Sequence, residues 1–121
     1  MARILLAEDE APVREFVVRA LAQAGHEVTA VEDGLGAVEA IAQDRFDLLL
    51  TDIVMPGLDG IALALKVAKE RPEMPIVLMT GFSAERQRAH NLDVLIHQVL
   101  SKPFSMDDLL AAVRAALGPA A

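Results

Sequence analysis

The feature that most constrains this sequence is a series of short apolar runs, each followed at once by polar residues. Residues 4–7, 48–50 and 76–79 are apolar without interruption, and the chain then continues with Glu8-Asp9, Thr51-Asp52 and Thr80. Runs that are apolar on both faces are typical of buried strands in a parallel sheet. The sequence therefore predicts a sheet whose strands carry polar side chains at their carboxyl ends.

Helical patterns lie between these runs and after the last of them. Apolar residues at helical spacing predict a helix over 13–24. Further helices are expected over 35–43 and 61–70, a short polar helix over 84–92, and two further strands at 27–31 and 96–100. The last helix has the clearest start, because Ser105 can cap it with Asp108 at the capping-box position, and Gly118 ends it after Leu117. This alternation predicts an α/β fold, a doubly wound five-stranded parallel sheet of order 2-1-3-4-5 with helices on both faces.

Composition limits the function classes. A chain of 121 residues with 54% hydrophobic residues is sufficient for one domain with a core. Lys and Arg total 11 against 18 Asp and Glu, and the net charge of −7 argues against direct binding to nucleic acid or to an anionic membrane. The lack of cysteine excludes disulfides and thiolate metal sites, and no apolar run approaches the roughly 20 residues that cross a bilayer. We expect a cytoplasmic protein without membrane insertion.

The polar residues after the strands form a candidate site. In a sheet of this order the carboxyl ends of the first and third strands meet, which brings Glu8, Asp9 and Asp52 together. Because crowded carboxylates repel one another, a cation is expected among them, and hard oxygen ligands favour Mg²⁺ over zinc. Thr80 follows the apolar run 76–79 and Lys102 follows the strand expected at 96–100, so both are expected at the same edge. A hydroxyl and an ammonium there would complement the oxygens of a phosphoryl group.

Four motifs follow the expected strands: Glu8-Asp9, the segment 52–60 (DIVMPGLDG), Thr80-Gly81 and Lys102-Pro103-Phe104. Together they resemble the receiver domain of bacterial two-component response regulators, the CheY-like superfamily, across essentially the whole chain.

The resemblance implies a role for each site residue. Asp52 is the phosphoacceptor, which takes its phosphoryl group from a histidine kinase or a histidine phosphotransferase. Glu8, Asp9 and Asp52 hold Mg²⁺ together with the backbone carbonyl of Val54. Thr80 supplies the switch hydroxyl and Lys102 contacts the phosphoryl oxygens. The peptide bond between Lys102 and Pro103 is expected to be cis, as in the family, and the output is expected to be a changed protein-binding surface.

Some positions depart from the family pattern. Val99 stands three residues before Lys102, where receivers commonly carry an aromatic residue that reports the movement of Thr80. Val54 and Phe82 are apolar and are expected to flank the path of the hydrolytic water, which predicts slow self-dephosphorylation. Phe82 can also pack at the edge of the core or serve as a contact residue for a partner, and we favour the contact role. We therefore expect a phosphoacceptor signalling protein rather than an enzyme.

Two other function classes fit the sequence less well. A Mg²⁺-dependent phosphohydrolase with an aspartyl nucleophile would need a second acid two residues after Asp52, where this chain has Val54. A flavin mononucleotide carrier of flavodoxin type would need a hydroxyl-rich phosphate loop after the first strand, where this chain has acids at positions 8–10.

Within the family, the chain most resembles the CpdR-type single-domain regulators. The likeness lies in Glu8 in place of an aspartate, the segment 86–91 (RQRAHN) and the segment 101–105 (SKPFS). It implies an adaptor that promotes proteolysis of substrates by the ClpXP protease and that phosphorylation silences. A receiver that serves as a phosphate sink is the alternative. We expect residues 1–121 to be one receiver domain with no output domain.

Overall fold

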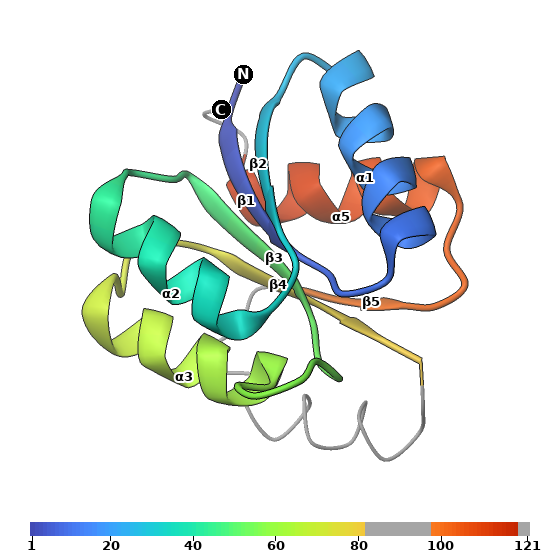
Figure 1. The fold of residues 1–121 in the computed structure, drawn as a ribbon. Coiled ribbons are helices and arrows are strands. Elements are labelled where there is room, and N and C mark those ends of the chain that lie inside the picture. The colour runs from blue at the N-terminus through green and yellow to red at the C-terminus, as the bar shows by residue number, and fades with distance from the viewer. Residues whose placement is uncertain (82–97, 119–121) are drawn as a thin grey trace.

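The computed structural model describes residues 1–81 and 98–118 of the chain (Figure 1). Strands and helices alternate from the N-terminus. The elements are β1 Arg3–Ala7, α1 Ala11–Gln23, β2 Glu27–Val31, α2 Gly34–Gln43, β3 Leu48–Asp52, α3 Gly60–Glu70, β4 Ile76–Thr80, β5 Gln98–Ser101 and α5 Met106–Leu117.

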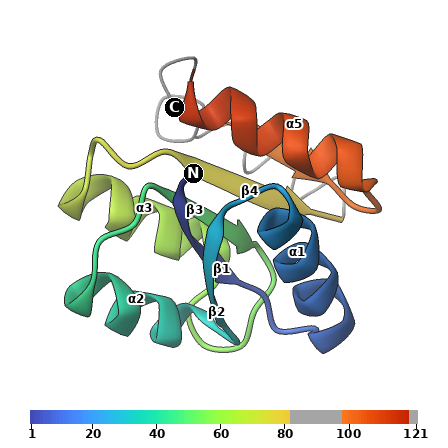
Figure 2. The same cartoon turned by 90° about the horizontal axis from the view of Figure 1, so that it is seen from above.

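The strands form one parallel sheet in the order β2-β1-β3-β4-β5, which confirms the predicted topology. Helices α1 and α5 cover one face of the sheet, and α2 and α3 cover the other (Figures 1 and 2). The register pairs Ala7 with Thr51, and Thr80 with Ser101, so these strands end at a common edge. We call it the carboxyl edge, and the opposite edge, where the strands begin, the amino edge.

Alternate residues of the strands belong to two separate cores, one on each face. Leu5 and Leu49 pack with α2 and α3, whereas Leu6 and Leu50 pack with α1 and α5. All four leucines have no exposed surface. Strands buried on both faces explain why the runs in the sequence are apolar throughout instead of alternating.

Helix ends follow the local signals of the sequence. Ser105 and Asp108 form the predicted capping box of α5, with the Ser105 Oγ accepting from the Asp108 amide at 3.0 Å. Asp33 caps α2 by accepting from the Gly36 amide at 2.7 Å, and Asp59 caps α3 in the same way. The Lys102–Pro103 peptide bond is cis, as the family resemblance implied.

The predicted elements are confirmed within two residues at each boundary wherever the structure describes the chain. The helix expected at 84–92, and with it Phe82, lies outside the described residues, as do positions 96 and 97 of the last predicted strand. Across the described ranges, none of the helices combines the length and apolarity needed to pass through a membrane.

Candidate phosphoryl-transfer site

The site lies at the carboxyl edge, where the strands deliver their polar residues. Glu8 directly follows β1, Asp52 ends β3, Thr80 ends β4 and Lys102 follows β5. Glu8, Asp52 and Thr80 are buried, because the neighbouring strands and loops cover the ends of the central strands. The predicted gathering of these residues at one edge is therefore confirmed.

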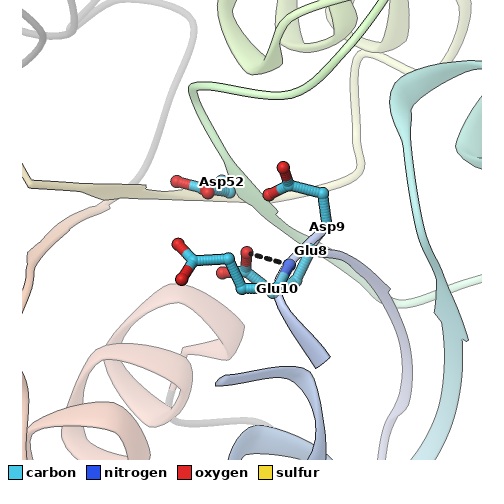
Figure 3. A group of neighbouring side chains, drawn as sticks. All are labelled: Glu8, Asp9, Glu10 and Asp52. Atoms are coloured by element: carbon cyan, nitrogen blue, oxygen red, sulfur yellow. Dashed lines mark hydrogen bonds between the residues drawn. The ribbon is translucent and has the colours of Figure 1, made fainter. Parts of the chain in front are cut away.

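The carboxylates form a compact cluster. One oxygen each from Glu8, Asp9, Glu10 and Asp52 lies within 4.8 Å of the others. Figure 3 shows the side chains of Glu8, Asp9 and Glu10, from the chain after β1, gathered beside Asp52 at the end of β3. Glu8 turns back to accept a hydrogen bond from the Glu10 amide at 3.1 Å. Sequence reasoning did not assign Glu10 to the site, although its position next to Asp9 was a signal that could have found it.

Lys102 joins the two buried acids. Its Nζ lies 3.0 Å from Glu8 Oε1 and 3.1 Å from Asp52 Oδ2. The other oxygen of Asp52 accepts a hydrogen bond from the Ile53 amide at 2.9 Å. Thus one ammonium bridges the strand ends of β1 and β3, and it fixes the orientation of the Asp52 carboxylate.

Burial makes this cluster electrostatically costly. It raises the pKa of Glu8 to about 7, against the opposing effects of the Glu10 amide and Lys102. Burial also raises the pKa of Asp52, although Lys102 works in the other direction. For Lys102, burial tends to lower the pKa, but Glu8 and Asp52 together raise it. The ammonium is therefore firmly held, while the buried carboxylates lack sufficient positive charge.

The donor set of the cluster fits a hard divalent cation. All four side chains offer carboxylate oxygens, which suit Mg²⁺ better than softer metals. A cation there would relieve the repulsion that burial intensifies. The cluster is therefore a candidate metal centre.

Two valines of the region differ in their surroundings. Val54, in the loop after β3, has 55% of its surface exposed. Val99, on β5, is half-buried and packs against the core under α2 and α3. Val99 therefore serves as a packing residue at the position where receivers commonly present an aromatic ring.

The comparisons with known proteins agree with this geometry. Residues 4–114 match the model of the response regulator receiver domain, and the chain belongs to this family of two-component signalling proteins. It is 44% identical to the response regulator receiver protein CpdR of Brucella abortus (strain 2308), over 91% of this chain and 92% of that protein.

Longer relatives share only this domain. The chain is 36% identical to the response regulator MprA of Mycobacterium leprae (strain TN) over 95% of its own length, but it spans only 50% of that protein.

Among solved structures, the response regulator TrrA of Thermotoga maritima in complex with Mg²⁺-BeF superposes with a TM-score of 0.84 at 30% identity, over 93% of this chain and 96% of that one.

Proposed function

We propose that this receiver accepts a phosphoryl group on Asp52 from a histidine kinase or a histidine phosphotransferase. The observation that carries the proposal is the bridge from Lys102 to Glu8 and Asp52, inside an acidic cluster at the ends of parallel strands. It places a nucleophilic carboxylate beside a fixed positive charge. Phosphoryl transfer requires mainly positioning and charge neutralisation, and this arrangement provides both.

In the proposed reaction, an Asp52 oxygen attacks the phosphorus of a phosphohistidine. The new P–O bond forms as the P–N bond breaks, and the imidazole leaves. Lys102 then moves from bridging two carboxylates to contacting the phosphoryl oxygens. Glu8, Asp9, Asp52 and the Val54 carbonyl would hold Mg²⁺, which supplies neutralisation of the transferring charge. The acids of this chain thus provide the metal site, and Lys102 orients the acceptor.

Thr80 is the proposed switch hydroxyl. It lies buried at the end of β4, and its carbonyl accepts a hydrogen bond from the Lys102 amide at 2.7 Å. A phosphoryl group on Asp52 would give the Thr80 hydroxyl a new acceptor and draw Thr80 toward the site. Such a movement shifts the population of a binding surface without changing the fold.

An open groove beside the site supports docking of a protein partner. It has a volume of about 490 Å³ and extends from Gly81 and Lys102 to the first turns of α1. Its lining includes Phe16, which is 41% exposed and whose ring centre lies 6.3 Å from that of Phe104, with the two rings tilted by 44°. A kinase or phosphotransferase that covers this apolar groove would bring its phosphohistidine to the Asp52 carboxylate.

The proposed output is an adaptor role of the CpdR type, with the ClpXP protease and its substrates as partners. The 44% identity to CpdR over 92% of that protein supports it. In this scheme the unphosphorylated form is active, and phosphorylation of Asp52 silences it. A phosphate sink is the alternative role. The phosphohydrolase alternative is disfavoured by the exposed valine at position 54, because that position would have to provide an acid.

Incubation with acetyl phosphate and Mg²⁺ tests the phosphoacceptor role. The intact mass should increase by one phosphoryl group in the wild type and not in Asp52→Ala. An adduct that survives this substitution would overturn the proposal.

Pull-down of the protease with phosphorylated protein and with Asp52→Ala then tests the adaptor role, and only the unphosphorylated form should bind.

A further inference from the structure

The loop between β3 and α3, residues 53–59, carries the Val54 carbonyl of the proposed metal site. In the part of the chain that the structure describes, the backbone of residues 54–58 makes no hydrogen bond. Met55 is buried in the core under α2 and α3, and Leu58 is half-buried against the same core, so the loop is held by packing. Its shape must therefore depend on what it touches.

One contact lies where the loop enters α3. A Cβ atom at Gly60 would overlap the carbonyl oxygen of Asp52 and lie 2.8 Å from the Ile53 Cα. The Gly60 amide donates to the Ile53 carbonyl at 2.8 Å. The end of the loop thus folds back directly onto the end of β3.

The second contact comes from α2, which is far from the loop in sequence. A Cβ atom at Gly34, the first residue of α2, would overlap the carbonyl oxygen of Leu58 and lie 2.9 Å from the Leu58 Cβ. Gly34 is buried, and the Asp33 cap fixes the start of its helix. The neighbouring Leu35 reaches over Gly57, which has a left-handed backbone with φ of 76°.

We propose that Gly34 is a positioning residue for the metal site. The absence of a side chain at Gly34 lets α2 lie directly on the Leu58 backbone, and this contact holds the loop that presents the Val54 carbonyl. Any side chain at position 34 would push Leu58 outward, and no backbone hydrogen bond between 54 and 58 would resist the shift. The inference rests on the proposed role of Val54 as a Mg²⁺ ligand.

Gly34→Ala tests this role through Mg²⁺ affinity. The dissociation constant is measured by titrating Mg²⁺ and following backbone amide signals of residues 52–59 in NMR spectra, so no phosphorylation is needed. We expect binding to weaken by about fivefold or more, and the loop signals to shift already without Mg²⁺. Because alanine has a higher helix propensity than glycine, a loss of affinity would run against the effect of helix propensity.

Gly36→Ala is the matched control. It makes the same change in the same turn of α2, but the nearest contacts of its new methyl group are side-chain atoms of Asp33 and Val31, at 3.2 Å, rather than the backbone of Leu58. Its Mg²⁺ affinity should stay within about twofold of the wild type. Ile41→Val, at the far end of α2, controls for a general loss of stability, because Ile41 is buried in the same core.

Leu58→Ala keeps the inference testable if Gly34→Ala does not fold, which circular dichroism will show. It removes the side chain that packs beneath α2 and should weaken Mg²⁺ binding in the same direction, by a smaller factor. A folded Gly34→Ala protein with wild-type affinity, or an equal loss in Gly36→Ala, would overturn the inference. If Gly34→Ala is unfolded, wild-type affinity in Leu58→Ala would overturn it. A wild type that does not bind Mg²⁺ at all would instead refute the proposed function, and this inference with it.

Discussion

Both edges of the sheet carry charged clusters, but the two clusters differ in burial and in the number of acids that share one cation. At the amino edge, Arg3 donates hydrogen bonds to both oxygens of Asp44, at 2.9 and 2.7 Å, and its guanidinium lies 5.5 Å from the ring centre of Phe46. The side chains of Arg3 and Asp44 are 39% and 51% exposed to solvent. At the carboxyl edge, Glu8 and Asp52 are buried and share Lys102.

The pKa values follow this difference. The hydrogen bonds from Arg3 lower the pKa of Asp44 to about 2. Burial raises the pKa of Glu8 to about 7. An exposed acid with its own partner favours the folded state, whereas buried acids that outnumber their cations oppose it until a further cation binds. The buried acids at the carboxyl edge therefore lower the stability of the metal-free folded state, whereas the exposed pair at the amino edge does not.

Asp52→Asn should have the largest effect, a complete loss of phosphoryl uptake. The amide keeps the shape of the side chain and removes a buried charge, so the protein should be at least as stable as the wild type. Intact mass after treatment with acetyl phosphate, and urea denaturation, measure the two effects. Asp44→Asn at the amino edge is the control and should be phosphorylated normally. Loss of uptake in both variants would argue against the distinction between the edges.

Lys102→Met should destabilise the metal-free protein by about 2 kcal/mol, because it leaves Glu8 and Asp52 without their shared ammonium. Mg²⁺ at millimolar concentration should restore part of the loss. Urea denaturation with chelator and with Mg²⁺ measures both. Unchanged stability in chelator would show that the bridge contributes nothing.

The stability of the metal-free protein should depend on pH in opposite directions at the two edges. A carboxyl whose pKa rises from 4.5 to about 7 on folding contributes stability below the lower value and loses it as pH rises through the upper one. With chelator present, stability should therefore fall, on the order of 2 kcal/mol, across this window. Glu8→Gln should flatten the slope. An unchanged slope in that variant would assign the effect to another group.

Val54→Asn should shorten the lifetime of the phosphorylated form by roughly tenfold, since a polar side chain near the acceptor can orient the hydrolytic water. Decay of the phosphorylated mass with time measures it. The control is Val99→Ile, a packing change on β5. Decay of the wild type within seconds would contradict the slow dephosphorylation expected here.

Arg3→Ala should have the smallest effect, a slight and salt-sensitive loss of stability with normal phosphorylation. The contribution of the Arg3–Asp44 pair should persist above the ordinary Asp pKa of 3.8 and disappear as pH falls toward about 2. This pH dependence of stability is therefore opposite in sign to the one expected for Glu8. Thermal unfolding of both proteins over acidic pH tests this, and a loss of phosphorylation would place Arg3 in the site.

The local sequence was sufficient to predict the strand ends and the α5 cap. Ser105 and Asp108 lie in one turn of chain, and the apolar run before Asp52 specifies a strand buried on both faces. The gathering of Glu8, Asp9, Asp52, Thr80 and Lys102 at one edge followed from the topology of parallel strands.

Contacts that depend on the path of loops were not predictable. Lys102 pairs with Glu8 across 94 residues, and the sequence pattern does not specify which acid a lysine will meet. Glu10 joins the cluster because the chain turns before α1 begins at Ala11. The contact between Gly34 and Leu58 depends on how closely a helix approaches a loop, which no periodicity encodes.

The division of the interior into two cores has a consequence for engineering. Among the described residues, the side chains of α1 and α5 pack with one set of strand residues, and those of α2 and α3 pack with the alternate set. Helices on one face could therefore be exchanged with those of another receiver without repacking the other face. Such chimeras would separate the proposed recognition of a partner from the proposed chemistry of the strand ends.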